Sequence, residues 1–207
     1  GYNTKLNSEF LIMGSINFHQ TNVEIDNVDF ENIFSEDALN IVKSNFKINN
    51  SNYKDIFSDA IDIDFASGKI EFVSFKNIRN DAIDFSGSNV EIYDSNFENV
   101  KDKLISGGEE SNIKISKIYA VNSKSGIISK DGSKVYAKDI FFNNVQIPFA
   151  AYQKKTEYDY GLLAVNDFKI DNFLIKFAKD DKSKITLNNI TQINIKKNKE
   201  GLSLVNQ

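Results

Sequence analysis

The repeat that decides the fold reads Asp81-Ala-Ile-Asp-Phe-Ser-Gly-Ser-Asn-Val-Glu-Ile-Tyr-Asp-Ser-Asn-Phe-Glu-Asn-Val100. Its opening motif also occurs one period earlier, as Asp59-Ala-Ile-Asp62. A column of aromatic residues has the same 22-residue spacing, namely Tyr53, Phe75, Phe97, Tyr119 and Phe141. A fixed period between about 20 and 50 residues is typical of a solenoid, in which each repeat is one coil that buries its apolar side against neighbouring coils.

Within each coil, apolar and polar residues alternate, as in Ile61-Asp-Ile-Asp-Phe65 and Val90-Glu-Ile92. Strict alternation rich in β-branched and aromatic residues indicates half-buried strands. Ser, Gly and Asn recur between these runs, where they favour turns. Each coil is therefore expected to hold three short strands. Each strand should pair with its equivalent one coil later, so that the coils form parallel sheets on three faces.

The prediction is a single all-β domain that covers residues 1–207. Residues 15–194 are expected to form about seven to eight coils. Residues 1–14 are expected to be an N-terminal cap and residues 195–207 a C-terminal tail or cap, because terminal coils expose sheet edges that must be covered. The apolar run Phe10-Leu-Ile-Met13 is the candidate for the N-terminal cover.

A second column follows the aromatic one by two residues and carries amides and an acid at four of its five positions. Stacked side-chain amides at a coil corner can bond to one another, as in other stacked β structures. The sequence therefore predicts a ladder of hydrogen-bonded side chains at one corner. Its members are Asp55, Asn77, Asn99 and Asn143, with Val121 as the exception.

Composition excludes several classes of protein. The chain has no Cys, so it has neither a disulfide framework nor a thiolate metal site. With a net charge of −4 and scattered Lys, it lacks the basic stripe of a nucleic-acid binder. No apolar run approaches the roughly 18–20 residues of a membrane span. The N-terminus at Gly1 has neither an initiator Met nor a signal pattern, and we interpret the chain as processed or trimmed, as a piece of a longer protein would be.

The seventh coil carries extra residues, 153–161, that interrupt the period. Insertions in solenoid repeats often form loops on a binding face. Aromatic side chains that project outward are the platforms on which sugar rings stack. The candidate ligand-binding residues around this loop are Tyr152, Tyr158 and Tyr160.

Acidic residues also fall into columns. Asp37, Asp59 and Asp81 share one phase, and Asp62 and Asp84 share another, with Asp64 beside them. Stacked like charges disfavour one another unless they are screened, protonated or bridged by a cation. Ca²⁺ prefers such oxygen ligands, and paired carboxylates can also act on glycosidic bonds. The candidate metal ligands are Asp59, Asp62, Asp64, Asp81 and Asp84; the alternative is a solvated acidic face.

The repeat at 81–100 resembles those of the right-handed parallel β-helix proteins, the pectate-lyase-like superfold, as found in secreted and surface-attached bacterial proteins. The resemblance covers roughly residues 15–194. It implies, together with the right-handed preference of parallel crossovers, a right-handed coil. It also implies a secreted or cell-surface location, although no signal peptide is present in this chain. The fold itself hosts many activities and specifies none.

Resemblance to the polygalacturonases of this fold would imply Asn-Thr-Asp, Asp-Asp, Gly-His-Gly and Arg-Ile-Lys motifs, of which only Asp180-Asp181 is present. The Asp-Pro-His of uronan epimerases is also absent. The only His is His19, and the only Arg, Arg79, is expected to pair with a neighbouring Asp. A general base suited to neutral pH is therefore scarce.

We accordingly expect a non-catalytic scaffold or glycan-recognition domain, whose partners are a polysaccharide or other chains of a surface assembly. One alternative is a polysaccharide lyase or hydrolase that acts on acidic glycans. The other is a structural segment of a spike or adhesin, in which coil stacking gives mechanical length.

Overall fold

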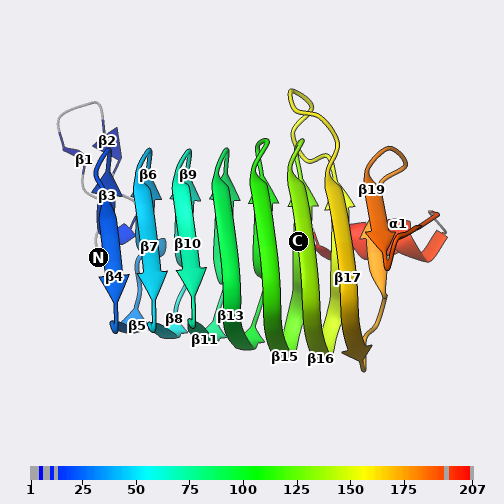
Figure 1. Cartoon of the computed structure of the whole chain (residues 1–207), viewed down its shortest axis with the longest axis horizontal. Coiled ribbons are helices and arrows are strands. Elements are labelled where there is room, and N and C mark those ends of the chain that lie inside the picture. The colour runs from blue at the N-terminus through cyan, green and yellow to red at the C-terminus, as the bar shows by residue number, and fades with distance from the viewer. Residues whose placement is uncertain (1–4, 7–9, 12–13, 194–195, 206–207) are drawn as a thin grey trace.

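The computed structural model describes residues 5–6, 10–11, 14–193 and 196–205. The chain is all-β and folds as a parallel β-helix of about eight turns, each of about 22 residues. The turns stack in a row from the N-terminal to the C-terminal end (Figure 1), and equivalent strands of successive turns pair in parallel. The repeat period and the strand alternation therefore predicted the architecture correctly.

Face 1 consists of the first strand of each turn. Its strands are β3 (Gly14–His19), β6 (Asp37–Val42), β9 (Asp59–Asp64), β12 (Ile83–Ser86), β14 (Lys103–Gly108), residues 125–130 of β15 (Asn112–Lys130), residues 147–152 of β16 (Lys134–Tyr152), and β18 (Phe177–Lys179).

Face 2 consists of the second strand of each turn. Its strands are β4 (Val23–Asp26), β7 (Asn45–Asn49), β10 (Ser67–Glu71), residues 89–93 of β13 (Asn89–Val100), 112–116 of β15, 134–138 of β16, 162–166 of β17 (Leu162–Asp171), and β19 (Lys184–Leu187). The short β20 (Ile190–Thr191) pairs antiparallel with β19.

Face 3 consists of the third strand of each turn. Its strands are β5 (Asp29–Ile33), β8 (Asn52–Ile56), β11 (Ser74–Ile78), and residues 95–100 of β13, 118–121 of β15, 140–143 of β16 and 168–171 of β17. Because β13, β15 and β16 continue around corners without a break, all three faces belong to one hydrogen-bonded sheet.

The interior is filled by columns of apolar side chains, one from each turn. On face 3 the rings of Phe30, Tyr53, Phe75 and Phe97 stack in sequence, with centroid separations of 4.5, 5.1 and 4.8 Å. All four rings are buried. Offset stacking of this kind adds to the free energy gained from burying the rings.

The predicted continuation of this column to Tyr119 and Phe141 is wrong. Phe97 pairs with Ala120, and Tyr119 is 45% exposed and stacks on Phe141 outside the core, at 5.1 Å. The cause is one extra residue in the preceding turn, at Glu109–Glu110, where both residues have positive φ. Strand pairing therefore shifts from a 22-residue to a 23-residue offset, and a shift of one residue reverses which side chains face inward.

The same shift explains the exception in the predicted amide ladder. Asn77 donates to Asp55 and Asn99 donates to Asn77, each at 2.7 Å, as predicted. Beyond the extra residue the ladder continues through Asn122, which accepts a hydrogen bond from Asn144 at 2.8 Å. These residues all have positive φ, a conformation that Asn and Asp tolerate better than other side chains.

Three elements lie outside the regular turns. The strands β1 (Lys5–Leu6) and β2 (Phe10–Leu11) pair antiparallel, and residues 12–13 of the predicted cap lie outside the described residues. The helix α1 (Lys196–Val205) packs on face 1 in the last turns (Figure 1), where Val205 joins an apolar cluster with Ile128 and Ala178. No helix in the described part of the chain is long and apolar enough to cross a membrane.

The first prediction tests the register. Phe97→Ala should lower the free energy of unfolding by about 3–5 kcal/mol, because it removes a buried ring and leaves a cavity. Tyr119→Ala is the matched control and should cost much less, because Tyr119 lies on the surface. Denaturant unfolding measures both values. Equal losses for the two variants would contradict the register.

Candidate functional site

The sequence-predicted acidic residues lie together on the outer side of face 1. Along β9, Ile61 and Ile63 are fully buried, whereas Asp62 and Asp64 alternate with them and are half-buried. Strand pairing places Asp84 next to Asp62 in the following turn. We call this set the acidic strip; it comprises Asp37, Asp59, Asp62, Asp64, Asp81 and Asp84.

Hydrogen bonds fix several of these carboxyl groups. Asn40 Nδ2 donates to Asp62 Oδ2 at 3.0 Å, and the backbone N–H of Asp81 donates to Asp59 Oδ1 at 2.8 Å. Each bond joins neighbouring turns. The strip is therefore held by the stacking of the solenoid and does not depend on a loop.

Two lysines lie at the C-terminal end of the acidic strip. Lys130 Nζ lies 3.4 Å from Asp84 Oδ1, and Lys103 Nζ lies 3.3 Å from Asp81 Oδ1 and also contacts Asp102. Burial raises the pKa of Asp81, and the positive charge of Lys103 opposes this rise. Among the described residues, the ion pairs of the acidic strip are made by Lys103 and Lys130, and no lysine or arginine from an earlier turn forms one with these acids.

Burial and mutual repulsion raise the pKa values of the remaining acids. Burial, helped by the neighbouring Asp64 and Asp37 carboxylates, raises the pKa of Asp62 to about 9. Burial raises the pKa of Asp37 to about 7 and that of Asp59 to about 6. Around neutral pH the strip therefore holds protons that ordinary aspartic acids would have released.

The five predicted metal ligands thus share one face, and their oxygen donors suit a hard cation such as Ca²⁺. However, within residues 14–193 and the other described segments, no three His, Asp or Glu side chains form a group that could hold a metal ion. Calcium binding stays a prediction.

Tyr152, one of the predicted ligand-binding residues, does not project into solvent. It is only 2% exposed and packs with Ile128, Ala150 and Val205 of α1. The strand alternation does place Tyr152 on the outer side of face 1, but α1 covers that side in the last turns. The expectation of an exposed platform at this position is therefore wrong.

Tyr158 and Tyr160 lie in the inserted loop, which projects beyond the edge of the sheet (Figure 1), and both are half-buried. Lys182 Nζ lies 4.9 Å from the centre of the Tyr160 ring. The loop is held by hydrogen bonds, among them two from the backbone N–H groups of Lys154 and Lys155 to Asp131 Oδ1, at 2.6 and 2.7 Å. The rings therefore belong to a loop that hydrogen bonds hold against the solenoid, and ligand binding by them stays a prediction.

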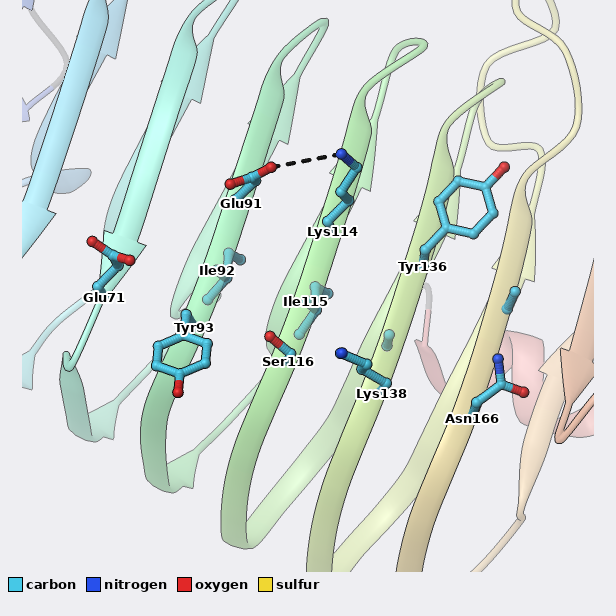
Figure 2. Close-up of a pocket in the computed structure, with 12 residues that line it drawn as sticks. Glu71, Glu91, Ile92, Tyr93, Lys114, Ile115, Ser116, Tyr136, Lys138 and Asn166 are labelled. Atoms are coloured by element: carbon cyan, nitrogen blue, oxygen red, sulfur yellow. Dashed lines mark ion pairs between the residues drawn. The ribbon is translucent and has the colours of Figure 1, made fainter.

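The structure also contains a hollow that the sequence did not predict. It lies on the outer side of face 2, across β10, β13, β15, β16 and β17, with a volume of about 430 Å³ (Figure 2). We call it the face-2 groove. The residues named in Figure 2 are Glu71, Glu91, Ile92, Tyr93, Lys114, Ile115, Ser116, Tyr136, Lys138 and Asn166; Ala137 and Ala164 complete its lining.

The groove exists because small residues stand between large ones in two outward columns. In one column Ser116 separates Tyr93 from Lys138, and in the other Ala164 follows Tyr136. Tyr93 and Tyr136 project from the sheet two turns apart, and the strand between them carries Lys114 and Ser116 (Figure 2). Ala164 lies one turn beyond Tyr136. The result is a hollow that is lined by two aromatic side chains and is shallow at Ser116 and Ala164.

The side chains around the groove are held in place by their neighbours. Lys117 donates to the Tyr93 hydroxyl and lies 4.7 Å from the ring centre, and Phe72 meets the Tyr93 ring edge-on at 5.7 Å. Glu91 forms an ion pair with Lys114 at 3.6 Å. The groove therefore offers an aromatic surface and charged groups of both signs in fixed positions.

Sequence-based reasoning missed the groove because its residues are dispersed between positions 71 and 166. The alternating runs at Val90-Glu-Ile92 and Ile113-Lys-Ile115 did identify outward positions. Only the 23-residue offset, however, aligns Glu91 with Lys114 and hence with Tyr136.

The second prediction concerns pH. The pKa of Asp62 lies above its ordinary value in the folded protein, so the stability that this group contributes is complete below about pH 4 and is lost as the pH rises towards 9. The melting temperature should therefore fall over this range, and Asp62→Asn should make the fall smaller. Asp171→Asn, at an exposed position, is the control. The same pH profile in all three proteins would disprove a linkage to Asp62.

Comparison with known proteins finds no matching family model and no matching curated protein. Among solved structures, the catalytic domain of a GH87 α-1,3-glucanase in complex with nigerose aligns with a TM-score of 0.43 and 11% identity, over 84% of this chain and 50% of that one. A polygalacturonase from Erwinia carotovora ssp. carotovora aligns with a TM-score of 0.33 and 10% identity, over 86% and 57%. The chain thus spans about half the length of these proteins, and the likeness lies in the solenoid architecture that the strand pairing already defines.

Proposed function

We propose that this chain is a non-catalytic glycan-recognition domain that binds a neutral oligosaccharide in the face-2 groove. The observation that carries the proposal is the pair of outward tyrosines, Tyr93 and Tyr136, which line one hollow together with the small residues Ser116 and Ala164 (Figure 2).

The chemistry of a pyranose ring supports this choice. One side of the ring presents C–H groups that pack on an aromatic surface, while its edge carries hydroxyl groups that need hydrogen-bond partners. Tyr side chains supply an apolar ring with a polar tip. Ser116, Lys138 and Asn166 place donors and acceptors along the same groove.

The charge of the groove favours a neutral ligand. Glu71 and Glu91 lie within it together with Lys114 and Lys138, so positive and negative groups balance. A polyanion would meet the glutamates without a compensating excess of cations. The hydroxyl groups of a neutral sugar can bond to groups of both signs.

The rigidity of the solenoid also favours binding. Each wall of the groove stands on a strand that is paired on both sides, and Tyr93 is additionally held by Lys117 and Phe72. Because these side chains are already ordered, ligand binding costs little conformational entropy of the protein.

A second candidate function is glycoside hydrolysis at the acidic strip. The observation in its favour is the pKa of about 9 for Asp62, which keeps this group protonated at neutral pH, as a general acid requires. The carboxyl of Asp84 in the next turn would act as its partner. Asp84 is, however, already paired with Lys130 at 3.4 Å, which makes this the weaker candidate.

The expected location follows from the proposed ligand. Polysaccharides and other surface polymers occur outside cells, so we propose that the domain acts in a secreted or cell-surface protein. Other chains of a surface assembly are then its further partners. The rigid stack of about eight turns would also serve as a spacer in such an assembly.

The third prediction tests glycan recognition. Tyr136→Ala should weaken binding of the best ligand from a panel of neutral tetrasaccharides by about tenfold or more, since it removes an aromatic wall of the groove. Tyr119→Ala is the matched control, because Tyr119 is equally exposed but lies on face 3. Isothermal titration calorimetry measures the affinities.

Equal affinities for the two variants would reject the groove as the binding site. The same mixtures, monitored for new reducing ends, separate the two candidate functions. Product release that is lost in Asp62→Asn but retained in Tyr136→Ala would favour hydrolysis at the acidic strip.

The fourth prediction concerns Ca²⁺. If the acidic strip binds the cation, millimolar Ca²⁺ should raise the melting temperature, since a ligand that binds only the folded state stabilises it. The double variant Asp62→Asn with Asp84→Asn should lose this shift. Mg²⁺ at the same concentration controls for ionic strength. If the parent protein melts at the same temperature with and without Ca²⁺, the prediction is wrong and the acidic strip is the alternative, a solvated acidic face.

A further inference from the structure

A row of aromatic and cationic side chains, one from each turn, lies at the corner between face 3 and face 1. Phe57, Arg79 and Lys101 hold the same corner position in successive turns, since their backbone N–H groups donate to Ile33, Ile56 and Ile78 at 2.9, 3.0 and 2.9 Å. Phe34 lies at the start of this row, with its ring centre 5.0 Å from that of Phe57. The row therefore begins with two aromatic residues and continues with two cations.

Arg79 and Lys101 are exposed, and no ion pair joins either of them to a carboxylate among the residues that the structure describes. The predicted ion pair between Arg79 and an adjacent Asp is therefore not formed. Asp81 is instead buried and bonded to Lys103. Like charges on neighbouring paired strands destabilise each other, and a bound anion would relieve this repulsion.

The guanidinium group of Arg79 has a fixed position. Its central carbon lies 3.9 Å from the centre of the Phe57 ring, and Phe57 is supported on its other side by Phe34. Stacking on an aromatic ring occupies the flat side of a guanidinium and leaves its N–H edge free to bind an oxyanion through two hydrogen bonds.

Both cations line one hollow of about 410 Å³. Its floor includes Asn77 and Asn99, each of which uses only one amide N–H in the ladder and retains another donor. The only acid in this lining is Asp55, which lies 4.0 Å from Lys54. A second hollow of about 230 Å³ shares Lys101 and adds Lys124.

We propose that the hollow lined by Arg79 and Lys101 binds a doubly charged tetrahedral oxyanion, either free sulfate or phosphate or a phosphate monoester on a sugar. Two cations from adjacent turns match two negative charges, and the amides of Asn77 and Asn99 add neutral donors. The site is independent of the face-2 groove, which lies on another face and has balanced charges.

The test is a titration of the isotope-labelled protein at low salt, monitored by the amide NMR signals of residues 77–79 and 99–101. The probes are inorganic sulfate, inorganic phosphate, glucose 6-phosphate and uncharged glucose. Sulfate and phosphate should shift these signals saturably, and glucose should not. A tighter association of glucose 6-phosphate than of inorganic phosphate would identify the sugar ester as the source of the anion, whereas an equal or weaker association would identify the free ion.

Arg79→Gln should weaken the association by about tenfold, which corresponds to the loss of a charged hydrogen-bonding partner. Lys76→Gln removes the same charge from face 3 outside the hollow and should leave the affinity unchanged. Because Arg79 is exposed, both variants should retain the circular dichroism of the parent protein. Equal weakening in both variants, or the absence of saturable shifts in the parent, would overturn the proposal.

Discussion

The pairing of each strand with its equivalent in the next turn is the interaction on which this structure depends. A single turn cannot bury its own apolar side chains, so the core forms only when successive turns stack in register. The continuous ring stack from Phe30 to Phe97 and the hydrogen-bonded ladder through Asn77 are two results of that register. One lies inside the solenoid and the other at its corner, and both repeat with the period of the turns.

In-register stacking also concentrates like residues on the surface. Wherever a repeat position keeps its residue type, similar side chains stand on adjacent strands, about 4.8 Å apart. This places carboxyl groups together in the acidic strip, where burial and repulsion raise the pKa of Asp62. It also places Arg79 beside Lys101 at the corner. The surfaces with the most unusual electrostatics thus arise from the same regularity that builds the core.

Interruptions of the regularity produce the other surface features. The extra residue at Glu109–Glu110 moves Tyr119 out of the core and brings Lys114, and with it Tyr136, into line with Glu91 in the face-2 groove. The helix α1 covers the last turns of face 1 and buries Tyr152. Face 1 is consequently polar in its early turns and covered in its last ones, whereas face 2 keeps an open groove along its middle.

The sequence by itself determined the period, the three strands per turn, the ring stack as far as Phe97 and the common face of the acidic residues. Each of these depends on residues at a fixed spacing, and alternation decides which side of a strand they occupy. The tertiary structure decided the exposure of Tyr119, the burial of Tyr152 and the existence of the groove between Tyr93 and Tyr136. These depend on a one-residue change in pairing between turns and on the packing of a helix from the end of the chain, and neither can be read from the repeat alone.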